Sequence, residues 1–327
     1  MKKFLFVLLT IVLVGCGKYN EKDAYNELIN SIEKLNSYHV SGELMLYKGE
    51  NSYTYDVDVA YKKDDFYRVS LINKVNNHEQ IILKNKEGVY VLTPSLNKSF
   101  KFQSDWPYNN SQIYLLNIIS TDLKKDDSRV LETTDSGYAF TSSVKFSNNK
   151  DLVNQKVYLN KDLKLSKVEI LDSNDNIKMQ MKFSNVEYNK DFDDEYFKLE
   201  NNMNTKEIEK TTMSELESIV YPMYVPVNTY LTSQDKIKLD EGERIILTFD
   251  GDSPFMLVEE TVSINDDFDT SVIYGDPYLI SDTVGAVTDY SVSWISNGVE
   301  YYLVSDAMDY VELMEVAESI SVNAIAK

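Results

Sequence analysis

Cysteine and histidine are almost absent from this chain of 327 residues. It contains one cysteine, Cys16, and two histidines, His39 and His78. A single cysteine excludes a disulfide framework and a zinc site built from cysteines. The two histidines lie on separate predicted strands, outside H-E-x-x-H or similar spacings. Ordinary strand positions therefore explain them better than a metal-binding pair does.

Motifs for catalysis are also missing. The chain has neither a glycine-rich phosphate loop nor the Gly-x-Ser-x-Gly motif that positions a nucleophilic serine. Its 53 Asp and Glu residues could supply a glycosidase-like pair of carboxylates, but no spacing selects one pair. Asn265, Asp267 and Asp269 begin like a calcium loop, although Thr270 stands where that loop needs glycine, which leaves a loose surface cation site as the alternative. These absences favour a protein that is not an enzyme and needs no cofactor.

Long apolar runs are absent after the first 14 residues. Lys2 and Lys3 precede an apolar run over residues 4–14, which is too short to be a comfortable membrane span. Gly15 and Cys16 follow, the arrangement at which a lipoprotein signal peptidase cuts and a diacylglycerol is attached. We therefore predict a signal peptide over residues 1–15 and acylation of Cys16, which would anchor the protein to the lipid bilayer at the extracytoplasmic face of the cell membrane.

Basic residues become scarce after residue 200. Residues 201–327 contain 6 Lys and Arg against 24 Asp and Glu, a net charge of −18, whereas residues 1–200 carry 27 against 29. This break predicts a first domain at 16–200, a polar linker at 201–212 and an acidic C-terminal domain at 213–327. Nucleic acid and anionic lipid head groups repel an acidic domain, so no nucleic-acid partner is expected and membrane attachment depends on the lipid.

Aromatic residues, by contrast, are plentiful, with 24 Tyr and 13 Phe against 11 Gly and 6 Pro. Such a composition favours strands, and Tyr53, Tyr55, Val57 and Val59 alternate with other residues as in a half-buried antiparallel strand. We expect nine to eleven strands in the first domain and a small α+β domain after it. Helices are predicted near residues 25–35, 113–123 and 307–320. Because no βαβ alternation is visible, the predicted fold class is mainly β (α+β) and not a parallel sheet.

The aromatic residues allow two interpretations. They can fill the core of a sheet, or they can line a concave sheet that holds a lipid chain or a peptide. Residues 98–112 mix polar and aromatic side chains, as at a strand end that leads into a capped helix. The same stretch would also suit a partner-binding rim, with Phe102, Trp106 and Tyr108 as candidate anchors.

Eight stretches carry a family resemblance. Residues 88–107 read GVYVLTPSLNKSFKFQSDWP and residues 244–249 read RIILTF. Further matching stretches are 61–63, 66–71, 80–83, 224–226, 285–289 and 298–303. The chain resembles the sporulation and germination lipoproteins of the YdcC and GerS group of spore-forming Gram-positive bacteria, over nearly the whole mature chain.

The resemblance implies both a fold and a function. The first domain would be a LolA/LolB-like half-barrel, a strongly curved antiparallel sheet with helices across its concave side. GerS-type members bind a cortex peptidoglycan amidase and allow it to act, so a non-enzymatic lipoprotein of the forespore envelope that supports such an amidase is expected. Shorter GerS-type relatives lack the second domain. The alternative is a LolA/LolB-like carrier or sensor that holds an acyl chain or a lipoprotein, a hydrophobic ligand, in the half-barrel.

Overall fold

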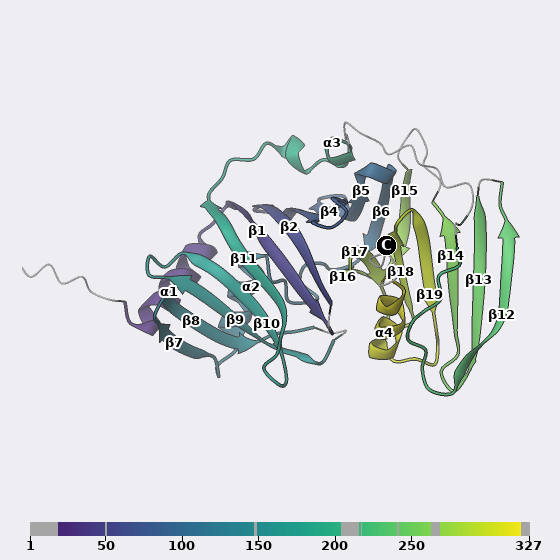
Figure 1. Cartoon of the computed structure of the whole chain (residues 1–327). Coiled ribbons are helices and arrows are strands. Elements are labelled where there is room, and N and C mark those ends of the chain that lie inside the picture. The colour runs from purple at the N-terminus through teal and green to yellow at the C-terminus, as the bar shows by residue number, and fades with distance from the viewer. Residues whose placement is uncertain are drawn as a thin grey trace, which may run out of the picture.

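The structure is a computed structural model of the chain. It describes residues 19–49, 51–146, 149–203, 216, 218–240, 242–262 and 269–321. Cys16, the predicted signal peptide, most of the predicted linker, and Asn265 and Asp267 of the cation-site candidate lie outside the described residues. Figure 1 shows two sheets side by side, the first formed mainly by the N-terminal half of the chain and the second by the C-terminal half.

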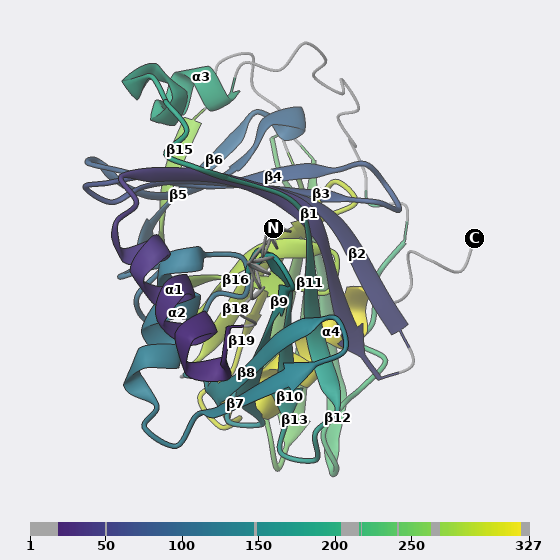
Figure 2. The same cartoon turned by 90° about the vertical axis from the view of Figure 1, so that its left-hand side faces the viewer.

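The first sheet has twelve strands in the order β15-β6-β5-β4-β3-β2-β1-β11-β10-β9-β8-β7. It curves around two helices, α1 (Glu21–Glu33) and α2 (Leu116–Lys125) (Figure 2). Its strands are β1 (Ser37–Lys48), β2 (Asn51–Lys62), β3 (Phe66–Asn73), β4 (Glu79–Asn85), β5 (Gly88–Thr93), β6 (Lys98–Gln103), β7 (Val130–Thr134), β8 (Gly137–Ser143), β9 (Leu152–Asn160), β10 (Leu165–Asp172), β11 (Ile177–Tyr188) and β15 (Asp269–Tyr274). Eleven of these lie between residues 37 and 188, within the expected range.

Alternation along the strands determines which side chains enter the core. Tyr53, Tyr55, Val57 and Val59 of β2 are all buried on the concave side of the sheet, while Asp56 and Asp58 point to the other side. Asn20 caps α1: its side-chain oxygen accepts a hydrogen bond from the backbone N–H of Asp23, the third residue of the helix. Its apolar stripe then packs onto the concave side of the sheet.

The second sheet has seven antiparallel strands in the order β12-β13-β14-β19-β18-β17-β16, and α4 (Tyr310–Ser321) packs on β18 and β19. Its strands are β12 (Thr229–Lys238), β13 (Glu243–Gly251), β14 (Phe255–Thr261), β16 (Asp276–Ile280), β17 (Thr283–Val287), β18 (Ser291–Ser296) and β19 (Val299–Val304). Asn297 and Gly298 join β18 to β19 with positive φ angles of 51° and 75°, as the Asn-Gly hairpin signal predicts. The mainly β fold class is confirmed.

Strand β15 crosses the division that the charge break suggested. Although it belongs to the acidic half of the chain, it pairs in parallel with β6 at the edge of the first sheet. Strand pairing is made by backbone N–H and C=O groups, which do not depend on side-chain charge. The change in charge along the sequence therefore could not predict that β15 joins the first sheet.

Buried hydrogen bonds also connect the two sheets. Gln80 of β4 accepts from the backbone N–H of Val284 at 2.6 Å and from the Thr283 hydroxyl at 3.0 Å, and its amide donates to the carbonyl of Val284 at 3.3 Å. The Tyr55 hydroxyl donates to the carbonyl of Ser281. Val284 and Ala286 of β17 belong to the same apolar core as the first sheet, so the second sheet closes one end of the half-barrel.

Candidate functional site

Side chains fill the concave face of the first sheet. Trp106 is buried and meets Tyr67 edge-on, with ring centroids 5.7 Å apart, and Tyr38 stacks on Tyr61 at 4.9 Å. Asn117 of α2 joins this layer: it accepts from the Tyr38 hydroxyl at 2.9 Å and donates to the Tyr67 hydroxyl at 2.6 Å. The hydroxyls of Tyr38 and Tyr67 therefore have hydrogen-bond partners within the core, whereas the Trp106 indole N–H has none among the described residues.

Little space is left inside the half-barrel at the end beside the second sheet. A residual cavity of about 50 Å³ lies between the sheet, residues 110–114 and residues 277–279. Ligand pockets commonly measure about 300–1,000 Å³, so this space is far too small for a lipid chain. A larger groove of about 1250 Å³ lies at the other end, where Tyr19, Leu28, Tyr138 and Tyr188 line it beside charged residues of the β9–β10 turn.

The candidate rim residues are divided between core and surface. Trp106 is 1% exposed and Phe102 is 5% exposed, so the prediction that they form an exposed rim is wrong for both. The turn that contains Trp106 folds inward because Lys84 donates to the Trp106 carbonyl at 2.9 Å and the Ser104 hydroxyl accepts from the Trp106 N–H at 3.0 Å. Only Tyr108, at 52% exposure, is available to a partner.

Tyr108 is held in a defined position at the surface. Its hydroxyl donates to Asp65, and the ammonium of Lys84 lies 4.7 Å from the centre of its ring. Partial burial raises the pKa of Tyr108 to about 12, so the phenol stays protonated in neutral solution. A fixed, half-exposed tyrosine is suited to an interface, but that a partner binds here stays a prediction.

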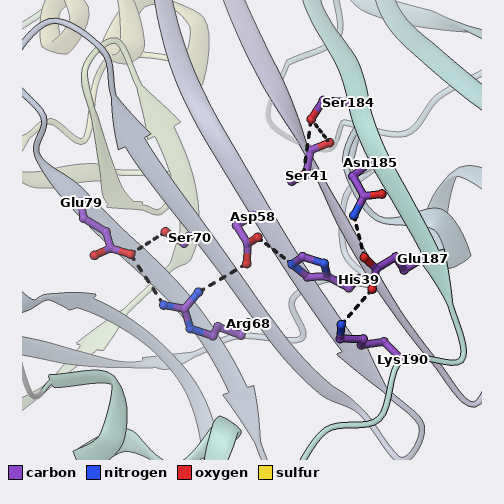
Figure 3. Close-up of polar contacts among 10 residues, drawn as sticks. All are labelled: His39, Ser41, Asp58, Arg68, Ser70, Glu79, Ser184, Asn185, Glu187 and Lys190. Atoms are coloured by element: carbon purple, nitrogen blue, oxygen red, sulfur yellow. Dashed lines mark hydrogen bonds and ion pairs between the residues drawn. The ribbon is translucent and has the colours of Figure 1, made fainter.

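The convex face of the first sheet carries a network of charged side chains (Figure 3). His39 Nε2 lies 2.7 Å from Asp58 Oδ2. The Arg68 guanidinium lies between Asp58 at 3.9 Å and Glu79 at 3.6 Å, and the Ser70 hydroxyl donates to Glu79 at 2.5 Å. These residues occupy the outward positions of β1 to β4, which explains why polar residues alternate with buried ones there.

A segment that we call the strap, residues 190–203, crosses part of this convex face. It includes the 3-10 helix η2 (Asp194–Phe197) and the short helix α3 (Leu199–Met203). Phe192 and Phe197 pack against Ala60, Ile81 and Leu83 of the sheet. Arg68 Nε also donates to Asn202 at 2.6 Å, so the guanidinium connects the strap to the charged network.

Among the described residues, the network lacks the contacts of a nucleophilic catalytic site. Within the described part of the chain, the hydrogen bond of His39 goes to Asp58 and none joins it to a serine, threonine or cysteine that could act as a nucleophile. His78 has different neighbours, with Ser95 at 3.4 Å. The same described residues contain no group of three or more His, Cys, Asp or Glu side chains placed to hold a metal ion. None of their helices is long and apolar enough to cross a membrane.

Comparison with known proteins identifies the family to which the chain belongs. Residues 1–197 match the family described as sporulation protein YdcC-like. The sporulation protein YdcC of Bacillus subtilis (strain 168) is 33% identical over 318 residues, which is 96% of this chain and 94% of that protein. The chain belongs to the YdcC-like family of sporulation proteins. The family description names sporulation and no catalytic activity.

Solved structures show more distant similarity. The GerS lipoprotein in complex with the CwlD amidase from Clostridioides difficile contributes a similar chain, at 15% identity and a TM-score of 0.32, covering 54% of this chain and 97% of that one. MucB is 13% identical with a TM-score of 0.34, and the match covers 92% of this chain and 96% of MucB. A LolA superfamily protein from Nitrosomonas europaea is 10% identical with a TM-score of 0.32, and the match covers 56% of this chain and 99% of that protein.

Proposed function

We propose that this YdcC-like protein is a lipid-anchored, non-catalytic lipoprotein that binds and supports a cortex peptidoglycan amidase during spore formation. The observation that carries the proposal is the half-barrel end beside the second sheet, because its own side chains occupy the concave face there and the space that remains is too small for a ligand. The amidase is the first partner class to test because GerS is a lipoprotein found in complex with an amidase.

The anchor would keep the protein close to the membrane. Only residues 17–19 separate Cys16 from Asn20, the residue that caps α1. We expect Cys16→Ser to move the protein from the membrane fraction into the soluble fraction of sporulating cells, because the acidic C-terminal half has no electrostatic attraction to anionic lipid. Immunoblots of the two fractions measure this. Retention of the variant in the membrane fraction would mean that a different feature anchors the chain.

Affinity purification from sporulating cells tests the partner. With the full chain as bait and membranes solubilised in mild detergent, an amidase should be recovered, and deletion of the gene should reduce muramic lactam in the cortex. Tyr108→Ala should lower recovery about tenfold or more if Tyr108 is an interface anchor. Tyr230→Ala is the matched control, because Tyr230 is an exposed tyrosine on the second sheet. Absence of amidase together with unchanged muramic lactam would refute the proposal.

The carrier alternative retains one observation in its favour. The groove of about 1250 Å³ beside α1 contains Leu28, Leu163 and Leu165, so a hydrophobic ligand could enter there. Native mass spectrometry of the protein released from membranes should then show bound lipid. Repeated spectra of the lipid-free mass alone would leave the partner-binding role as the better explanation.

A further inference from the structure

Another cleft lies where the two sheets meet, next to the residual cavity of the half-barrel, with which it shares Met179 and Tyr278 as lining residues. It measures about 520 Å³ and is lined by residues 47–49 and 51 of the β1–β2 hairpin and by residues of α4. Figure 1 shows β1, β2 and α4 at the junction of the two sheets. Five of the residues that line it are tyrosines: Tyr47, Tyr53, Tyr224, Tyr278 and Tyr310. Its volume falls within the range of small-ligand sites, and junctions between modules are a common position for such sites.

The charged side chains of this cleft are nearly balanced. Lys48 and Lys178 face Asp151, Glu315 and Glu318. Lys48 forms an ion pair with Glu318. Burial acts to lower the pKa of Lys48, but Glu318 together with Tyr278 and Tyr53 outweighs it, so the pKa is raised. Lys178 is paired with Asp172 at 3.2 Å. Because both cations already have carboxylate partners, a phosphate or another anion would have to displace one of them.

An acyl chain suits the cleft no better than an anion does. It would remove water from the Lys48–Glu318 pair and from the tyrosine hydroxyls without offering any hydrogen bond in return. The Tyr310 hydroxyl is already buried without a hydrogen-bond partner among the described residues. Burial also raises the pKa of Tyr310 well above its ordinary value, so this group remains a neutral donor that lacks an acceptor.

We propose that the cleft binds a neutral saccharide, as a single ring or a short oligosaccharide. A pyranose ring has an apolar C–H face that packs on aromatic rings, and hydroxyl groups that exchange hydrogen bonds with phenols, amides and carboxylates. Tyr224 supplies an accessible ring and Tyr310 supplies the unsatisfied hydroxyl. This site goes beyond the partner-binding role and does not depend on it, so each can fail without the other.

Titration with defined sugars tests the site. The full chain, purified in a detergent without a sugar head group, is titrated with oligomers of N-acetylglucosamine and of glucose by isothermal calorimetry. Saturable binding of at least one series is expected. Tyr224→Ala should weaken it about tenfold through loss of the ring, and Tyr310→Phe by up to about tenfold through loss of one hydroxyl.

Controls separate loss of binding from loss of fold. Tyr224 is 38% exposed, so alanine there should leave the thermal midpoint close to that of the wild type, and Tyr230→Ala, at a 62% exposed site outside the cleft, should bind as the wild type does. No saturable binding of either sugar series would overturn the proposal. So would sugar binding that neither cleft variant changes, or binding of palmitate that Tyr224→Ala abolishes.

Discussion

Replacing Trp106 by alanine is expected to lower the free energy of unfolding by about 3–5 kcal/mol. The side chain is 1% exposed and packs edge-on against Tyr67 beneath the curved sheet. Alanine would leave a void that the hydrogen-bonded strands around it cannot collapse to fill, so both transfer and packing energy are lost. Urea unfolding of the two proteins, compared by midpoint at constant slope, measures the difference.

Two neighbouring variants make this test specific. Tyr108→Ala, two positions along the chain, should cost less than about 1 kcal/mol because Tyr108 is half-exposed. The loss of unfolding free energy in Trp106→Phe should lie between those of Tyr108→Ala and Trp106→Ala. The indole N–H has no hydrogen-bond partner among the described residues, so phenylalanine loses only side-chain volume. If Trp106→Ala were as stable as the wild type and instead lost its partner, Trp106 would be a surface anchor after all.

Local patterns were sufficient to predict much of the fold. The alternation in β2 identifies its buried face, because successive strand residues point to opposite sides regardless of what lies next to them. The apolar stripe of α1 and its cap at Asn20 depend on residues only a few positions apart. The hairpin at Asn297 and Gly298 is likewise a property of adjacent residues.

Features that depend on distant pairing could not be predicted. Gln80 and Val284 are hydrogen-bonded across 204 positions, and no neighbour of Gln80 in sequence signals this contact. The outward position of Asp58 follows from strand alternation, but its contact with His39 and Arg68 depends on the register between three strands. Trp106 was ambiguous for the same reason, because an aromatic residue in a polar stretch can turn inward or outward.

Two buried carboxylates on the second sheet have opposite environments. Glu259 of β14 is 0% exposed and lies between Ile245 and Tyr301 of the adjacent strands. Its carboxylate accepts a hydrogen bond from the Val220 N–H at 3.1 Å. Burial raises its pKa from the usual 4.5 to about 7. Glu243 of β13 accepts from Lys236 at 2.7 Å, and this hydrogen bond lowers its pKa. The two side chains hold Leu216 and Val220 against the sheet, since Glu243 also accepts from the Leu216 N–H.

Glu259→Gln is expected to stabilise the protein at alkaline pH and to change little in acid. In the folded protein, Glu259 binds its proton more tightly than in the unfolded chain, so its favourable contribution is full below pH 4.5 and is lost as the pH rises to about 7. The difference between the pKa values of 4.5 and about 7 corresponds to about 3 kcal/mol. This value is the upper limit for the increase in the free energy of unfolding that Glu259→Gln can bring at pH 8. Glutamine keeps an oxygen for the Val220 N–H and removes the buried charge.

Urea unfolding at pH 4 and pH 8 measures this difference, and Glu243→Gln provides the opposite sign. Because the pKa of Glu243 is lowered, its carboxylate stabilises the folded protein above the pKa that it has in the unfolded chain, and this stabilisation disappears as the pH falls. Glu243→Gln should therefore be less stable than the wild type at pH 8 and close to it in acid. A gain for Glu259→Gln of equal size at both pH values would show that packing and not ionisation is responsible. Opposite pH slopes for two carboxylates on one buried face would establish that the acidic half of the chain includes a charge that opposes its own folding.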